Sequence, residues 1–191
     1  MRTVRLNTPL AEADVRKLKL EDIVYISGRI FTARTAFHVR VINRNLVPPM
    51  DFSVHNVMAH SGPVMKKGSE GEWIVVNAGG TTSNRLERYG AAIIKKLGLR
   101  ALCGKGTMGP ETIKAMQECG AVHLCTNLDR MGFGPHIKKV MGVYNLEEMG
   151  QTEATWVFEV EDCGPFVVDI DAHGNNLFKN VHEKVIGKLF S

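Results

Sequence analysis

The chain has 191 residues, of which 44% are hydrophobic and 23% charged, a composition typical of a folded globular domain and not of a disordered segment. The net charge of +4 is too small to indicate a nucleic-acid binder, and no apolar run approaches the roughly 18 residues that cross a bilayer. Because the N-terminal stretch also lacks the apolar centre of a signal peptide, we expect one domain that works in the cytoplasm.

The first part of the chain predicts one long strand and one helix. Residues 22–33 are apolar and β-branched, which favours a strand, and Gly28 within it permits a bulge or a close approach of backbones. Residues 34–46 can form a helix that ends before a pair of prolines. Residues 50–71 are rich in Gly, His and Lys and are expected to be irregular.

The middle of the chain alternates strands, loops of small residues and helices. We expect strands at residues 73–77, 99–103 and 121–126, and the first of these shows the pattern of a buried strand. The loops are expected at residues 79–83 and 104–109. One helix is expected to begin near Asn84 and end at Gly98, and the next to begin at Pro110 and end at Gly120. This order predicts an α/β core with parallel strands.

The last part of the chain predicts extra strands. Residues 156–161 and 166–170 are apolar and β-branched, and residues 171–176 form a cluster of turn formers. The fold class is therefore expected to be α/β, with a mixed sheet that adds partly antiparallel strands to the parallel core.

The cysteines and histidines do not predict a metal site. Cys103, Cys119, Cys125 and Cys163 form no C-x-x-C pair, and the seven histidines show no metal-binding spacing. We expect the four cysteines to be reduced thiols that are mostly buried.

Two loops are candidate sites because each follows a strand and precedes a helix, where ligands of open α/β sheets bind and where helix N–H groups favour anions. The first loop offers backbone donors and the hydroxyls of Thr81, Thr82 and Ser83, with Arg85 close behind. The second places Lys105 between Gly104 and Gly106. Both suit a small anion, although the glycines equally fit plain turns and the charged residues plain solvent-exposed positions.

Neither loop matches a nucleotide-binding motif. Gly98 and Gly104 enclose one residue too many for a P-loop, and Gly106 stands where that motif has Ser or Thr. The spacing of Gly104, Gly106 and Gly109 fits a dinucleotide fingerprint, but no acidic residue ends the following strand.

Arg34 follows the first long strand and can form a bidentate pair with a carboxylate, or else a surface salt bridge worth about 0–1 kcal/mol. His38 can share its helix face, and His60 can line a cleft; packing or plain loop positions fit both equally.

Four stretches, in their order and spacing, resemble the β subunit of two-subunit class I fumarases and L-tartrate dehydratases, which is also the C-terminal domain of single-chain class I fumarases. They are residues 26–38, 79–85, 104–108 and 153–175. The likeness covers about residues 5–180, so residues 1–191 are expected to be a single domain with a C-terminal tail from about residue 181.

The resemblance implies a swivelling β/β/α fold and the reversible hydration of a small dicarboxylate, most simply fumarate to malate, or else the dehydration of tartrate to oxaloacetate. It implies a [4Fe–4S] cluster that the partner α subunit holds and this chain does not, in an assembly with two of each subunit.

The resemblance also implies site residues. Thr81, Arg85 and Lys105 take the catalytic positions; Arg34, Gly80, Thr82, Gly104 and Gly106 take substrate-binding positions; His38 and His60 are further candidates. The chain departs from the family pattern at Thr35, where an Asp is usual, at Leu86 and at Thr107. Without that Asp, His38 loses an orienting partner.

Two other classes of function stay open on the residues alone. The loops equally suit a non-catalytic module that binds a dicarboxylate or another anion. A basic nucleic-acid binder is a third reading, for which no recognition motif is present.

Overall fold

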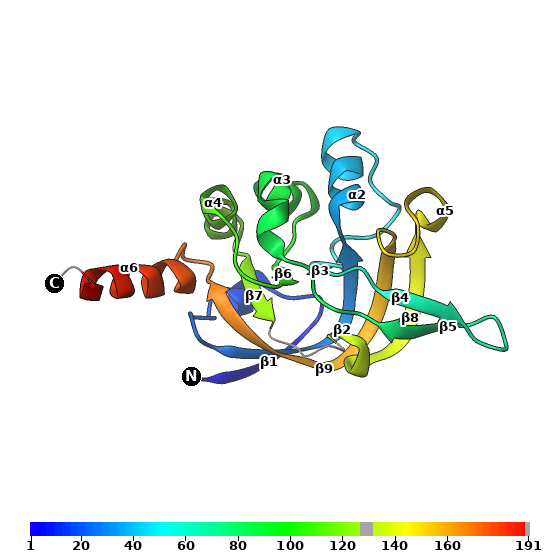
Figure 1. Cartoon of the computed structure of the whole chain (residues 1–191), viewed down its shortest axis with the longest axis horizontal. Coiled ribbons are helices and arrows are strands. Elements are labelled where there is room, and N and C mark those ends of the chain that lie inside the picture. Colours follow the sequence, from blue (N-terminus) through cyan, green and yellow to red (C-terminus); the bar gives the residue numbers. More distant parts are fainter. Residues whose placement is uncertain (127–131, 190–191) are drawn as a thin grey trace.

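A computed structural model of the chain describes residues 1–126 and 132–189. It contains a seven-stranded mixed sheet, helices packed on one face of that sheet, and a two-stranded hairpin that projects to one side (Figure 1). Across the sheet the strands are β1 (Thr3–Asn7), β2 (Ile23–Ala33), β3 (Val57–His60), β6 (Ala101–Gly104), β7 (Val122–Thr126), β9 (Thr155–Ile170) and β8 (Ile137–Tyr144). The hairpin is β4 (Val64–Lys67) and β5 (Trp73–Asn77).

The helices are short except for three. They are α1 (Glu12–Val15), α2 (Thr35–His38), α3 (Glu87–Leu97), α4 (Pro110–Cys119), α5 (Leu146–Met149) and α6 (Leu177–Leu189). A π-helical turn (Val39–Asn43) continues α2, a 3₁₀ turn (Ser83–Leu86) precedes α3, and another (Gly134–His136) precedes β8.

The sheet is parallel from β1 through β2, β3 and β6 to β7, and antiparallel where β9 pairs with β7 and β8. The other edge of β9 pairs with β2, antiparallel, so β2, β3, β6, β7 and β9 close into a ring. This confirms the α/β class and the mixed sheet.

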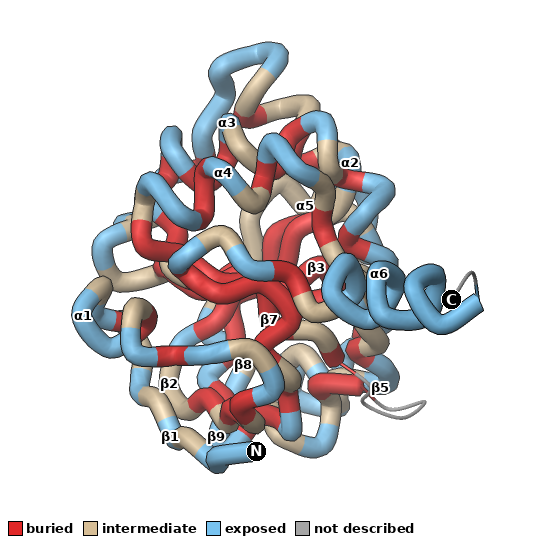
Figure 2. Tube along the Cα trace, turned by 90° about the vertical axis from the view of Figure 1, so that its left-hand side faces the viewer, coloured by how far each residue is buried: buried red, intermediate tan, exposed pale blue. Residues whose placement is uncertain are grey.

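The core has two layers because side chains alternate between the faces of each strand. Val57 and Ala59 of β3 point into the ring, where they pack with Trp156 and Phe158 of β9. Met58, between them, points to the other face and packs against the helices. Figure 2 shows the buried strands at the centre of the molecule and the exposed helix turns around them.

Gly28 allows the close approach that its place in the strand predicts. Its φ is +100°, and a Cβ there would lie 2.5 Å from Thr8 Oγ1. The register between β2 and β9 shifts on both sides of Ile26, so the bulge is also confirmed.

Three of the expected elements are corrected. The segment expected to be irregular, residues 50–71, contains β3 at the centre of the sheet and β4. Residues 73–77 form a strand, but among the described residues β5 pairs only with β4, and Val76 is 49% exposed, so the buried pattern was misleading. The two strands expected at 156–161 and 166–170 are one continuous strand, β9, because its partner β2 runs past both.

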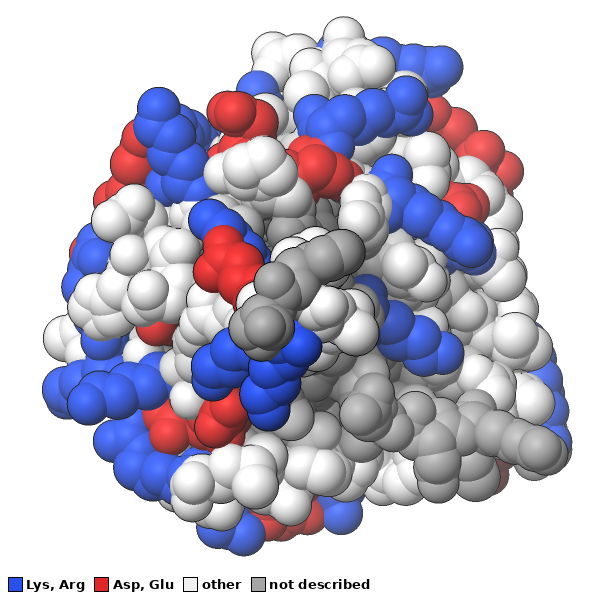
Figure 3. All heavy atoms as spheres, turned by 60° about the vertical axis from the view of Figure 1, so that its left-hand side comes forward, with Lys and Arg blue, Asp and Glu red and all other residues white. Residues whose placement is uncertain are grey.

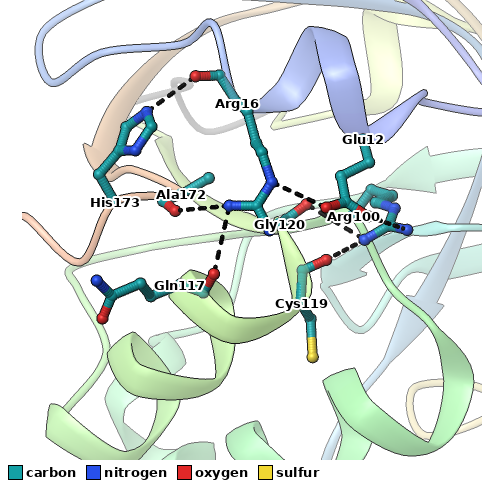
Figure 4. Close-up of polar contacts among 8 residues, drawn as sticks. All are labelled: Glu12, Arg16, Arg100, Gln117, Cys119, Gly120, Ala172 and His173. Atoms are coloured by element: carbon teal, nitrogen blue, oxygen red, sulfur yellow. Dashed lines mark hydrogen bonds and ion pairs between the residues drawn. The ribbon is translucent and has the colours of Figure 1, made fainter.

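Gly98 and Gly120 end α3 and α4 in the left-handed conformation, as expected. The last carbonyls of α4 accept hydrogen bonds from Arg100, and the carbonyl of Gln117 accepts one from Arg16 (Figure 4). Glu12 of α1 pairs with both arginines at 2.8 and 2.9 Å. These cations therefore hold α1 against α4, at the edge of the sheet where β6 and β7 begin.

The C-terminal segment expected to be a tail is helical up to Leu189, while residues 190–191 lie outside the described residues. Helix α6 projects from the body and buries none of its residues (Figures 1 and 2). None of the helices in residues 1–126 and 132–189 has both the length and the apolar character needed to cross a membrane.

Candidate functional site

The candidate site residues gather where the parallel strands end. Ala33 pairs with His60 across β2 and β3, Ala59 pairs with Cys103 across β3 and β6, and Gly104 pairs with Cys125 across β6 and β7. Because these strands are parallel, the residues that follow them share one edge of the sheet, which is where α/β proteins bind ligands. We call this the carboxyl edge.

The loop at residues 79–83 leads from the hairpin back to the carboxyl edge, although β5 is not a core strand. Thr81 N–H donates to the His60 carbonyl at 2.6 Å, and Lys105 N–H donates to the Thr81 carbonyl at 3.0 Å. Ser83 N–H donates to the Lys105 carbonyl at 2.9 Å, and Ser61 Oγ donates to the Gly79 carbonyl at 2.9 Å. The loop is thus fastened between the ends of β3 and β6, which brings the two predicted loops together.

Gly104 has a steric reason to lack a side chain. A Cβ at this position would lie 2.1 Å from Ser83 Oγ and 3.1 Å from the Thr81 carbonyl oxygen. A Cβ at Gly80 would lie 3.1 Å from Thr126 Cγ2, which is tighter than usual, and in ordinary contact with Lys105 Cγ at 3.7 Å. Gly106 has a φ of +74°, which a glycine adopts without strain.

The polar groups on this edge are accessible. Thr81 is half-buried, while Thr82, Arg85 and Lys105 are exposed. Among the described residues, neither the Arg85 guanidinium nor the Lys105 ammonium has an ion-pair partner. Lys105 lies beside the Thr81 loop through its backbone, whereas Arg85 follows on the 3₁₀ turn.

Arg34 stands at the end of β2 and already has an acidic neighbour. Its Nε lies 3.4 Å from Glu153 Oε1, and the other oxygen of Glu153 accepts a hydrogen bond from Ala36 N–H at 2.8 Å. The side chain passes over Gly62, where a Cβ would lie 2.6 Å from Arg34 Cδ. About a third of the Arg34 side chain is exposed, so its Nη groups can still bind an anion.

His38 and His60 lie beneath the edge and not in an open cleft. They are 0% and 1% exposed, and their rings lie 5.5 Å apart. His38 Nδ1 lies 2.8 Å from the Arg34 carbonyl oxygen, and the Nε2 atoms of both rings have no hydrogen-bond partner among the described residues. Burial lowers the pKa of His38 to about 4 and that of His60 well below its usual range.

This burial predicts a loss of stability in mild acid. The unfolded chain takes up protons at His38 and His60 below about pH 6.5, whereas folded His38 resists protonation down to about pH 4. The unfolded state therefore binds more protons in this interval, and the free energy of unfolding falls as the pH falls, by about 3 kcal/mol from His38 alone.

Urea unfolding between pH 7 and pH 4.5 measures this loss. His38→Gln should flatten the pH dependence, while His182→Gln on exposed α6 should leave it unchanged. An equal slope in the unmodified chain and in His38→Gln would contradict the assignment.

Sequence reasoning missed two buried residues beneath the Thr81 loop, His123 and Asp169, and it counted Ser83 among the loop hydroxyls open to a ligand, although Ser83 is buried. Ser83 Oγ lies 2.9 Å from His60 Nδ1 and 2.9 Å from His123 Nε2, and His123 Nδ1 lies 2.6 Å from Asp169 Oδ1. Ser83, His123 and Asp169 are each 0% exposed. The only signal in the sequence was a lone His and a lone Asp inside apolar strands.

The N-terminus of α4 is not the anion site that its position suggested. Glu87 of α3 accepts hydrogen bonds there from Gly109 N–H at 2.6 Å and from Thr112 N–H and Oγ1 at 3.2 and 2.8 Å. The carboxylate of Glu87 therefore already satisfies this helix end.

The charged side chains do not form one continuous basic surface on the face seen in Figure 3. Among the described residues of that face, Lys and Arg lie between Asp and Glu and uncharged areas.

The described residues do not fit a [4Fe–4S] cluster. They contain no group of three or more His, Cys, Asp or Glu side chains that could hold a metal ion. Burial raises the pKa of Cys103 well above its usual range and that of Cys163 to about 12, so both stay thiols and not the thiolates that bind iron. All four cysteines are unpaired, as expected, and two of them are fully buried.

Comparison with known proteins agrees with this architecture. A family profile described as "Fumarase C-terminus" matches residues 1–181. The putative L(+)-tartrate dehydratase subunit beta of Methanocaldococcus jannaschii is 38% identical over 188 residues, which cover 94% of this chain and 93% of the relative. The L(+)-tartrate dehydratase subunit beta of Escherichia coli is 32% identical over 177 residues, 90% of this chain and 85% of the relative.

A third relative is longer. The putative class I fumarate hydratase of Geobacillus stearothermophilus is 39% identical over 189 residues, which are 98% of this chain but only 36% of that protein. The family match and these identities extend over nearly the whole chain, including the carboxyl edge. The chain therefore belongs to the fumarase C-terminus family, together with the β subunits of class I fumarases and L(+)-tartrate dehydratases.

Proposed function

We propose that the chain is the β subunit of an iron–sulfur hydro-lyase that adds water reversibly to a small unsaturated dicarboxylate, and that its preferred reaction is fumarate to malate. Its active form is an assembly with an α subunit, two of each, and the α subunit holds the [4Fe–4S] cluster. The names of the relatives support the reaction class, since two are tartrate dehydratase β subunits and one is a class I fumarate hydratase, and the two β-subunit names support the partner. A cytoplasmic location suits the four unpaired cysteines.

The observation that carries this proposal is that backbone hydrogen bonds hold the Thr81 loop between the ends of β3 and β6. The hydroxyls of Thr81 and Thr82, backbone donors and Lys105 thereby lie on a single edge. Lys105, with Arg85 and Arg34, would bind the carboxylates of the substrate, and each charged hydrogen bond is worth about 1.5–3 kcal/mol.

Thr81 would hold and transfer the proton at its Oγ1. A hydroxyl ionises far above neutral pH, so a neighbouring cation must stabilise the negative charge that develops on the oxygen. Lys105 would supply this cation, since its backbone N–H donates to the Thr81 carbonyl.

Tartrate dehydration to oxaloacetate is the alternative reaction, because two of the relatives carry that name. Tartrate differs from malate by one hydroxyl group. The substrate choice therefore depends on which groups face that hydroxyl, including groups of the α subunit.

Reconstitution tests the proposal. The full chain alone is expected to bind no iron and to show no hydratase activity, and mixing it with the cognate α subunit under anaerobic cluster assembly should give activity on fumarate and malate. The α subunit alone is the control. Activity on tartrate alone would favour the alternative reaction, and a mixture inactive on all three substrates would overturn the proposal.

The same material separates an enzyme subunit from a non-catalytic anion-binding module. Calorimetric titration of the chain alone with malate should give weak or no binding, because the site is incomplete without the α subunit. Tight binding would favour the module instead.

A further inference from the structure

A buried chain of side chains runs beneath the Thr81 loop. It begins at Asp169 on β9, passes through His123 on β7, and reaches Ser83, which also contacts His60 on β3. All four residues are at most 1% exposed. Such a set is costly to bury unless its hydrogen bonds are made, which suggests that it does more than pack.

The order Asp, His, Ser is that of a hydrolase triad, but the arrangement excludes a nucleophile. Ser83 is 0% exposed, so no substrate can reach its hydroxyl. The hydroxyl also lies 2.9 Å from both His60 Nδ1 and His123 Nε2, so it is already engaged on both sides.

The Ser83 hydroxyl carries a single proton, so the hydrogen bonds along this row of buried side chains run in one direction. With one proton on the His123 ring, Nδ1–H donates to the Asp169 carboxylate at 2.6 Å and Nε2 accepts from Ser83 Oγ–H. The Ser83 oxygen then accepts from His60 Nδ1–H. In this arrangement both rings carry their proton on Nδ1, and His60 Nε2 has no hydrogen-bond partner among the described residues.

We propose that Ser83 is a positioning residue for the Thr81 loop, and that Asp169, His123 and His60 fix the direction of its hydroxyl. The loop is held twice by the same residues. His60 bonds Ser83 through its side chain and Thr81 through its carbonyl, at 2.9 and 2.6 Å. Ser83 thereby ties the loop down two residues beyond the Thr81 hydroxyl.

The contact with Gly104 shows how closely Ser83 packs against the end of β6. A Cβ at position 104 would meet Ser83 Oγ at 2.1 Å, so the hydroxyl occupies the space that a side chain at the end of β6 would take. Ser83 N–H also bonds the Lys105 carbonyl. A change at Ser83 is therefore transmitted to both Thr81 and Lys105, and the catalytic consequence of this inference rests on the proposed function.

Histidine tautomers test the chain without any activity. Long-range ¹⁵N–¹H spectra of the full, unmodified chain at pH 7.5 should show His60 and His123 as neutral rings protonated on Nδ1, the minority form of free histidine. In Ser83→Ala the His60 resonances should shift, because Nδ1 has lost its acceptor. A His60 ring protonated on Nε2 in the unmodified chain would overturn the inference.

Kinetics of the reconstituted complex test the consequence. Ser83→Ala should lower kcat about ten- to a hundredfold with little change in KM, because a misplaced catalytic group slows the reaction more than it weakens binding. The matched control is Thr32→Val, which removes another buried hydroxyl, one that bridges Trp156 N–H at the start of β9 and the Ala154 carbonyl just before it. It should lower stability but leave kcat per folded molecule unchanged.

The two tests fail in distinguishable ways. Unchanged kcat in a folded Ser83→Ala variant, beside an active unmodified complex, contradicts the positioning role alone. An inactive unmodified complex contradicts the proposed function, and the tautomers still decide whether the directed chain exists.

Discussion

Replacement of Thr81 by valine is expected to lower kcat of the reconstituted enzyme by about 10²- to 10⁴-fold, the range typical of losing a positioned acid or base. Valine has the shape of threonine without the hydroxyl, so the loop keeps its backbone bonds to His60 and Lys105. KM for fumarate should change little, because the carboxylates of the substrate bind elsewhere. Steady-state kinetics in both reaction directions measure the effect.

The matched control for Thr81→Val is Thr3→Val, the same substitution at an exposed position of edge strand β1. It should leave kcat and KM unchanged. If Thr81→Val retained the unmodified kcat while Lys105→Met lost activity, the proton would have to be handled by another group, and Thr81 would be left with a binding role at most.

Replacement of Trp156 by alanine is expected to cost about 3–5 kcal/mol of stability, as is usual for a large buried aromatic residue. Trp156 is 0% exposed inside the ring, lies 5.0 Å from the ring of Trp73 and 6.4 Å from that of Phe158, and donates a hydrogen bond to the Gln151 carbonyl at 2.8 Å. Gln151 in turn bonds both backbone groups of Met65 at 2.8 and 2.9 Å. The variant should therefore also loosen the hairpin.

Trp73→Ala is the control for Trp156→Ala. Trp73 packs on the same cluster from the hairpin side but is only partly buried, so its loss should cost clearly less. Urea unfolding monitored by far-ultraviolet circular dichroism compares the two. Equal losses would mean that the interior of the ring relaxes around the missing indole far more than a close-packed core normally does.

Local signals predicted the helix ends well and the placement of short strands poorly. Gly98 and Gly120 could be read as helix ends because only glycine adopts the left-handed conformation readily, whatever surrounds it. β3 was missed because it has only four residues, ends in His60 and is flanked by polar residues. The position of β3 at the centre of the sheet depends on its pairing with β2 and β6, and a short stretch of sequence around β3 contains neither strand.

The strand at residues 73–77 shows the opposite error. A run of apolar residues predicts a strand, but not the sheet to which the strand belongs. Within residues 1–126 and 132–189, β5 pairs with β4 alone, and Ile74 and Val76 are 38% and 49% exposed.

In the candidate site too, local sequence signals predicted one part and missed another. The loops around Thr81 and Lys105 could be found because their motifs are local and resemble those of a known family. The chain beneath them could not, because Ser83 lies 23 positions from His60 and 40 from His123, and His123 lies 46 from Asp169. Only the closing of the sheet brings these residues together.

β9 is the last strand of the described chain, and it closes the ring by pairing with β2, where the bond from Trp156 N–H to Thr32 Oγ1 joins residues 124 positions apart. During synthesis the ring stays open until this strand has left the ribosome, and joining such distant segments is slow because of the entropy of closing a long loop. Asp169 arrives with the same strand. A nascent or partly unfolded chain thus lacks an ordered carboxyl edge even when its helices have formed, so the proposed site is completed only when the fold is.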